Sequence, residues 1–88
     1  WELLFRTRAL DNQVYTLGAA PARDVSGPYV SYGNSLIADP WGTVVQRLED
    51  EENLLVEELD LTKIQKVREE LPLLKHLRHD VYCLREVK

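Results

Sequence analysis

The sequence feature that most constrains the fold is an uncharged run of seven residues, VYTLGAA, at positions 14–20. Such a run suits a strand that is covered on both faces better than a strand with one face in water. Pro21 ends the strand because proline has no N–H to give to a sheet. Before the run, apolar residues recur at the helical spacings of three and four: Trp1, Leu4, Phe5, Ala9 and Leu10. Residues 1–24 therefore predict a helix that leads into a buried strand, which is a unit of a layered α/β domain.

The strongest hairpin signal lies in residues 34–48. Two aliphatic segments, 34–38 and 43–48, flank Asp39-Pro40-Trp41-Gly42. Proline at the second position and glycine at the fourth are typical of a type I turn. The acidic run 49–52 is interpreted as a solvated loop rather than a cation site, because no glycine-spaced calcium-binding pattern surrounds it. Residues 53–59 then predict a third strand, which completes a meander.

The last third of the chain predicts one helix and an arm. Asp60 suits the N-cap of a helix that must end at Pro72, since the residue before a proline avoids helical angles. Residues 73–88 predict an ordered arm with at most a short helical turn, apolar enough to need a surface to lie on. The expected order is helix, strand, three-stranded meander, helix and extended arm, with both helices on one face. Nothing remains to cover the other face of the first strand, so a second copy or an N-terminal part is expected there.

Composition excludes several classes of protein. Eighty-eight residues make at most one small domain. A net charge of −4 argues against a nucleic-acid partner, and no apolar run approaches the ~20 residues that span a bilayer. The single Cys83 excludes an internal disulfide and fits a reducing compartment. The chain contains no methionine and begins within a helical pattern, so we expect it to be a fragment.

No catalytic constellation can be assembled from these residues alone. Cys83 lies near His76 and His79, which would suit a thiol–imidazole pair or part of a zinc site. A structural thiol is the favoured interpretation, because a fourth metal ligand is missing and Cys83 lies near the chain end. Arg23 could pair with a substrate carboxylate through its bidentate fork, but we favour a role in structuring its own loop. We expect no metal site and no cofactor.

Several short motifs in fixed order resemble the nitrilase, or carbon–nitrogen hydrolase, superfamily. The segments are WELL at 1–4, RALDNQVY at 8–15, PARD at 21–24, YGNS at 32–35, DPWG at 39–42 and RHDVY at 78–82. The last four segments, from PARD onward, narrow the resemblance to the omega-amidase branch, and the motifs span essentially the whole chain. Three positions depart from the pattern: Asn34 stands where histidine is expected, and Gly18 and Ala20 stand where hydroxyl residues are expected.

This resemblance implies the C-terminal part of a four-layer α-β-β-α sandwich. Residues 1–88 would be the C-terminal portion of a single carbon–nitrogen hydrolase domain whose catalytic portion lies upstream. There a glutamate base, a lysine and a cysteine nucleophile hydrolyse an amide through a thioester. The substrates implied are 2-oxoglutaramate, 2-oxosuccinamate or similar small linear amides, which yield an acid and ammonia. The implied protein is a homodimer in the cytoplasm, with mitochondria as a second location.

The resemblance also implies roles for residues of this chain, none of them catalytic. The strand end would form the wall of the substrate pocket, and other positions would touch the dimer partner. The wall residues are Gly18, Ala19 and Ala20; the dimer contacts are Gly33, Ser35, Arg78 and Tyr82. The chain alone is expected to be inactive. The alternative is a non-catalytic interaction or dimerisation module of the same fold, and an upstream reading frame with the three catalytic motifs would decide against it.

Overall fold

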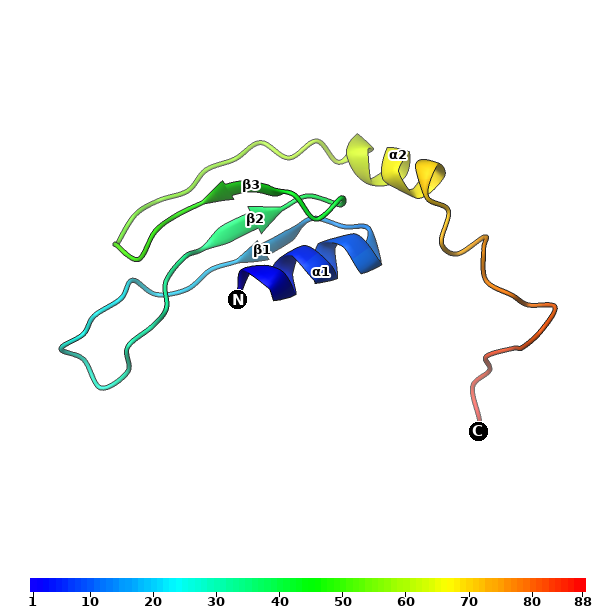
Figure 1. The fold of residues 1–88 in the computed structure, drawn as a ribbon, viewed down its shortest axis with the longest axis horizontal. Coiled ribbons are helices and arrows are strands. Elements are labelled where there is room, and N and C mark those ends of the chain that lie inside the picture. Colours follow the sequence, from blue (N-terminus) through cyan, green and yellow to red (C-terminus); the bar gives the residue numbers. More distant parts are fainter.

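The computed structural model describes residues 1–88. Its elements are α1 (Glu2–Asn12), β1 (Thr16–Gly18), β2 (Leu36–Ala38), β3 (Val44–Arg47) and α2 (Thr62–Glu70). The strands form one antiparallel sheet in the order β1-β2-β3, and α1 lies along one face of it (Figure 1). The predicted succession of helix, strand, three-stranded meander, helix and arm is confirmed except for the third strand of the meander.

A small core joins α1 to the sheet. Ala9 is fully buried against Leu36 and Ala38, and Phe5 packs on the edge of this cluster. A Cβ added to Gly18 would lie 2.5 Å from Cζ of Phe5, so glycine lets the ring lie directly on β1. Small residues at the contact bring helix and strand close together, and close packing of this kind is what stabilises a core.

The face of β1 that points away from α1 is open in this chain. Thr16 donates its hydroxyl to the Phe5 carbonyl at 2.9 Å, and Gly18 also faces α1. Because side chains alternate along a strand, Leu17 points the other way, and it is 62% exposed. The second cover predicted from the uncharged run is not supplied by these residues, as the sequence order led us to expect. The strand is also shorter than the predicted 14–20.

The predicted hairpin turn is present. The Gly42 N–H donates to the Asp39 carbonyl at 2.8 Å, and Gly42 has a φ of +77° that favours glycine. The turn also lies against α1, because Arg6 donates its Nε–H to the Gly42 carbonyl at 2.7 Å. The pairing of β2 with β3 shifts register between Ile37 and Ala38, next to this turn.

The prediction of a third meander strand at residues 53–59 is wrong. The segment runs extended beside β3 (Figure 1), but none of its residues makes a backbone–backbone hydrogen bond. Leu54 and Val56 are each 79% exposed, whereas Leu55 between them is half-buried and borders the same shallow pocket as Ile37. The residue types of this segment favour an extended backbone. Pairing in a sheet also requires a neighbouring strand whose backbone lies at hydrogen-bonding distance.

The second helix lies at the turn end of the sheet, so the expectation that both helices share one face is wrong (Figure 1). Its N-cap is Leu61 rather than the predicted Asp60, although the Asp60 carboxylate still accepts the Thr62 N–H at 3.0 Å. Val67 is buried, and the Gln13 side chain donates to the Leu71 carbonyl at 2.7 Å, joining the ends of the two helices. These contacts attach α2 without stacking it on a strand.

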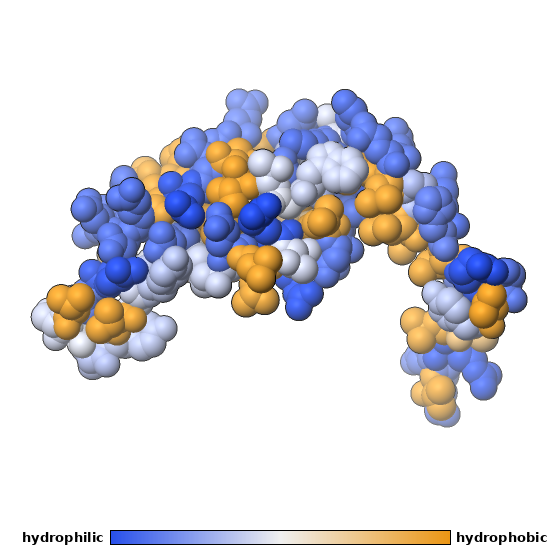
Figure 2. All heavy atoms as spheres, viewed as in Figure 1, coloured by the Kyte–Doolittle hydropathy of each residue, from blue (hydrophilic) through white to orange (hydrophobic).

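Both projecting parts of the molecule carry exposed apolar residues (Figure 2). One part is the loop 24–32, and the other is the arm 73–88, which contains turns only, as predicted. The molecule is consequently elongated, with extents of 57 × 34 × 21 Å. Neither helix is both long enough and apolar enough to cross a bilayer. The exposed apolar residues are Val25, Tyr29, Val30 and Tyr32 in the loop and Leu73, Leu74, Leu77, Val81, Tyr82, Leu84 and Val87 in the arm.

Candidate functional site

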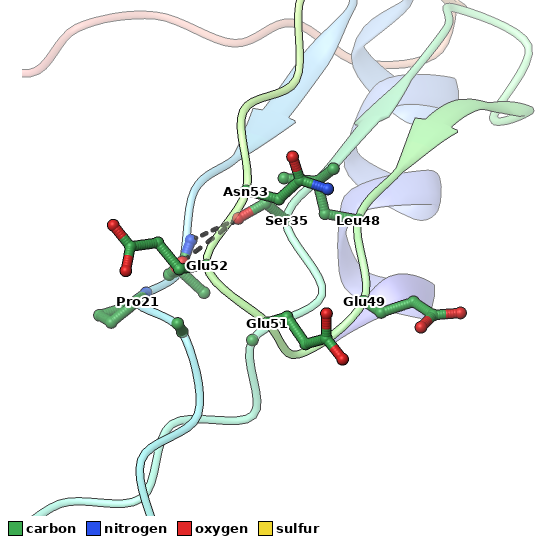
Figure 3. Close-up of a pocket in the computed structure, with 10 residues that line it drawn as sticks. Pro21, Ser35, Leu48, Glu49, Glu51, Glu52 and Asn53 are labelled. Carbon is green, nitrogen blue, oxygen red and sulfur yellow. Dashed lines mark hydrogen bonds between the residues drawn. The ribbon is translucent and has the colours of Figure 1, made fainter.

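A cavity of about 230 Å³ lies just beyond the carboxyl end of β1 (Figure 3). Three segments that are distant in sequence line it: residues 20–22 after β1, residues 33–35 before β2, and residues 48–53 after β3. Each segment is a loop attached directly to a strand of the sheet. The cavity is therefore fixed by the carboxyl ends of β1 and β3 and the amino end of β2.

Ser35 joins two walls of this cavity. Its hydroxyl accepts the Ala20 N–H at 2.9 Å and lies 3.3 Å from the Ala20 carbonyl, as the dashed lines in Figure 3 show. Next to it, Gly33 has a φ of +72°, and an added Cβ would lie 2.8 Å from Cα of Asp50. Asn34 also has a positive φ, 60°, a conformation that asparagine tolerates better than most residues. The segment before β2 is thus tightly held against the loop after β3.

The three residues predicted to form the pocket wall point in different directions. Gly18 is buried under the Phe5 ring, and Ala19 is exposed on the opposite face of the sheet, in the shallow pocket that Leu55 also borders. Ala20 lines the cavity at the end of β1. The structure brings one of the three into this cavity, and the role of all three toward a substrate stays a prediction.

Arg23 binds several partners within its own chain. Its Nε–H donates to the Ser31 carbonyl at 3.2 Å, and Nη2 donates to the Tyr32 carbonyl at 2.7 Å. Nη1 lies 3.0 Å from a carboxylate oxygen of Asp50, and the Arg23 backbone N–H donates to the Asp50 carbonyl at 2.7 Å. Its guanidinium also lies 5.6 Å from the centre of the Tyr32 ring, within cation–π distance. The arginine therefore connects its loop to two others.

No set of acidic, histidine and cysteine side chains in the chain is gathered as a metal site would require. The carboxylates of Glu49, Glu51 and Glu52 are exposed and do not converge (Figure 3). Cys83 is an exposed thiol in the arm. The one thiol of these 88 residues thus lies outside the cavity at the end of β1.

The residues predicted to touch a dimer partner have the following surroundings. Gly33 is buried against Asp50, and Ser35 holds Ala20. Arg78 binds both carboxylate oxygens of Asp80 at 2.8 and 2.7 Å; this bidentate contact raises the pKa of Arg78 and lowers that of Asp80. Tyr82 is half exposed in the arm. Their contact with a second subunit stays a prediction.

Sequence reasoning missed the buried carboxylate of Asp39, which is 4% exposed. One of its oxygens accepts the N–H groups of Trp41 and Thr43 at 2.9 and 3.0 Å, and the other accepts Nζ of Lys63 at 2.7 Å. Burial raises the pKa of this carboxyl, but the hydrogen bonds from Lys63, Thr43 and Trp41 together lower it below its usual value. An aspartate that opens a turn often binds the N–H two residues on, and this signal could have identified it.

Comparisons with known proteins all point to one family. A family model described as carbon-nitrogen hydrolase matches residues 1–69. The omega-amidase NIT2 of Mus musculus is 46% identical over 88 residues, which are 100% of this chain and 32% of that protein. The omega-amidase NIT2 of Homo sapiens is 42% identical over 84 residues, 96% of this chain and 30% of that protein. The chain thus spans about a third of the length of these relatives.

Solved structures give the same result. The C. elegans NitFhit protein superposes with a TM-score of 0.83 at 37% identity, over 94% of this chain and 20% of that chain. Saccharomyces cerevisiae Nit3, a member of branch 10 of the nitrilase superfamily, superposes with a TM-score of 0.82 at 41% identity, over 89% of this chain and 29% of that chain. The two helices and the antiparallel sheet match this fold.

Proposed function

Because the chain belongs to the carbon–nitrogen hydrolase family, we propose that it is the C-terminal part of an enzyme of the omega-amidase type. The observation that carries the proposal is the 46% identity to an omega-amidase along all 88 residues. In the complete protein, meaning this chain joined to an upstream part, residues 1–88 supply scaffold and a wall of the site. The upstream part supplies the glutamate, lysine and cysteine that react.

The proposed reaction is hydrolysis of a small linear amide such as 2-oxoglutaramate or 2-oxosuccinamate. The upstream cysteine attacks the amide carbon, ammonia leaves, and water releases the acid from the thioester. A lysine and nearby N–H groups stabilise the negative charge that develops on the amide oxygen. The arrangement of the present residues supports this division, because no cysteine lines the cavity at β1 and Cys83 belongs to the arm, which projects toward the other end of the molecule (Figure 1).

Release of ammonia from 2-oxoglutaramate tests the proposal. The complete protein should turn the substrate over, and its Cys83→Ser variant should do so at an unchanged rate. The 88-residue chain alone should release no ammonia. Turnover by the short chain, or loss of turnover in Cys83→Ser, would contradict the proposed location of the nucleophile.

Ala19 offers a test of the proposed wall. A tryptophan at this exposed position should reduce the space for the amide and raise KM by about tenfold or more, since a misfit of a few methylene groups has that effect in enzyme pockets. The matched control is Val25→Trp, at a residue that is 81% exposed in the projecting loop. Equal kinetics for Ala19→Trp and the wild type would remove Ala19 from the wall.

We also propose that the complete protein is a homodimer of the cytoplasm, with mitochondria as a second location. The exposed apolar side chains of the arm support the dimer, because Leu84 and Val87 are 96% and 86% exposed in the single chain. Deletion of residues 73–88 should yield a monomer in sedimentation experiments. A dimer that survives this deletion would exclude the arm from the interface.

A further inference from the structure

Arg23 joins the three loops that form the cavity at β1. Its own loop is the first, the carbonyls of Ser31 and Tyr32 belong to the segment leading to the second, and Asp50 belongs to the third. All three guanidinium nitrogens have a partner within the chain. The planar guanidinium group has N–H donors in fixed directions, so it can hold three acceptors in one geometry. The flexible ammonium group of a lysine cannot do this.

These contacts reinforce the shape of the cavity, whose loops are also joined by backbone hydrogen bonds. Arg23 follows Ala22 directly, and both Gly33 and Ser35 follow the carbonyls that Arg23 binds. Without the guanidinium, the Ser31 carbonyl would lose its donor, the Tyr32 carbonyl would keep only the amide of Asn34, and the Asp50 carboxylate would lose its ion pair. Because Asp50 lies between Glu49 and Glu51, its unpaired charge would also repel its neighbours. Both effects would loosen the loop 48–53, leaving it held by backbone hydrogen bonds such as that from the Asn34 N–H to the Glu49 carbonyl at 3.0 Å.

We propose that Arg23 is a positioning residue that holds the wall of the amide site in place. The inference rests on the proposed function, and it goes further by assigning the site's geometry to one side chain. Arg23 acts through Ala20, Ala22 and the loop 48–53, because each of its three guanidinium nitrogens is directed to a partner within the chain. Its loss should therefore weaken substrate binding and leave the chemical step nearly unchanged.

Steady-state kinetics of the complete protein on 2-oxoglutaramate test the proposal. Arg23→Gln should raise KM by about tenfold, the equivalent of one charged hydrogen bond lost from the wall, with kcat within about twofold. A role in stability alone would lower the fraction of folded enzyme, and thus apparent kcat, without moving KM. The matched control, Arg8→Gln, removes an exposed arginine paired with Asp11 on α1 and should leave both constants unchanged.

Asp50→Asn separates positioning from direct contact with the substrate. If Arg23 acts by holding the loops, weakening its ion pair with Asp50 should raise KM in the same direction as Arg23→Gln. If Arg23 instead binds the substrate carboxylate, Asp50→Asn would free the guanidinium and leave KM unchanged or lower. That second result would overturn the inference.

Amide hydrogen exchange tests the inference without any turnover. In Arg23→Gln, exchange should accelerate together in residues 20–22, 33–35 and 48–53, with α1 unaffected. Faster exchange confined to residues 24–32 would refute it. A wild-type protein that does not hydrolyse the amide would overturn the proposed function, whereas unchanged exchange in Arg23→Gln would overturn the positioning role.

Discussion

The buried carboxylate of Asp39 should be the most sensitive polar group in this part of the protein. It binds two N–H groups of its own turn and Nζ of Lys63 on α2, so one side chain fixes the hairpin and attaches the second helix. Asp39→Ala removes all three hydrogen bonds and leaves the N–H groups of Trp41 and Thr43 without a partner. We expect a loss of about 3 kcal/mol in the free energy of unfolding, since each hydrogen bond to a charged group contributes about 1.5–3 kcal/mol and Lys63 remains partly solvated.

Asp39→Asn divides this loss into two parts. Its side-chain oxygen can still accept the two N–H groups, but the charge opposite Lys63 is gone. We expect a loss of about 1–2 kcal/mol, close to the value for a single charge-assisted hydrogen bond near the surface. The control is Asp11→Asn, on an exposed side chain of α1, which should change stability by less than about 0.5 kcal/mol.

The pH dependence gives a second signature of the same group. The pKa of Asp39 is lower in the folded protein than its ordinary value of 3.8. A depressed pKa means that the stabilisation is complete above about pH 4 and is lost as the pH falls through the folded-state value. The pKa of Lys63 is raised by its hydrogen bond to Asp39, so this side of the pair loses its effect only as the pH rises past about 10.5.

Urea unfolding of the complete protein between pH 2.5 and pH 7 measures both effects. The wild type should lose more stability than Asp39→Asn below pH 4, so the two curves should converge in acid. Parallel curves over the whole range, or an Asp39→Ala variant as stable as Asp11→Asn, would show that the Asp39 carboxylate does not stabilise the fold.

Three other substitutions follow from packing, each measured by thermal or urea unfolding. Gly33→Ala should destabilise by about 2 kcal/mol, because its φ of +72° is strained for alanine and the Cβ meets the Asp50 backbone; a neutral result would contradict this geometry. Gly18→Ala should cost about 1–3 kcal/mol by displacing the Phe5 ring, and an added Phe5→Leu change should recover part of that loss. Leu36→Ala should cost about 3 kcal/mol, whereas Leu54→Ala, at a residue 79% exposed, should be nearly neutral.

Local patterns predicted the elements whose cause is local. The spacing of apolar residues predicted α1, and the Asp-Pro-Trp-Gly turn predicted the hairpin, because both depend on residues within a few positions of each other. Residues 53–59 have the composition of a strand, yet pairing requires a neighbouring backbone whose position their own sequence does not determine. The place of α2 likewise depends on the contact of Lys63 with Asp39, across 24 positions.

The candidate site was likewise predicted only in part from the sequence. The resemblance to the family directed attention to the end of β1, where Ala20 lines a cavity. Gly18 and Ala19 face opposite sides of the sheet because successive residues of a strand alternate between its faces. Which of the two faces α1 depends on where β1 begins, and the sequence alone did not determine that position. The partners of Arg23 come from positions 31, 32 and 50, so its role as a connector became visible only when the loops were seen together.

We propose that these 88 residues support a reaction whose nucleophile lies in the upstream part of the complete protein. Trapping the thioester with 2-oxoglutaramate by acid quench, followed by mass spectrometry of the digested peptides, tests it most directly. We expect the acyl group on a cysteine outside residues 1–88 and an unmodified Cys83. An acyl group on Cys83 would contradict it.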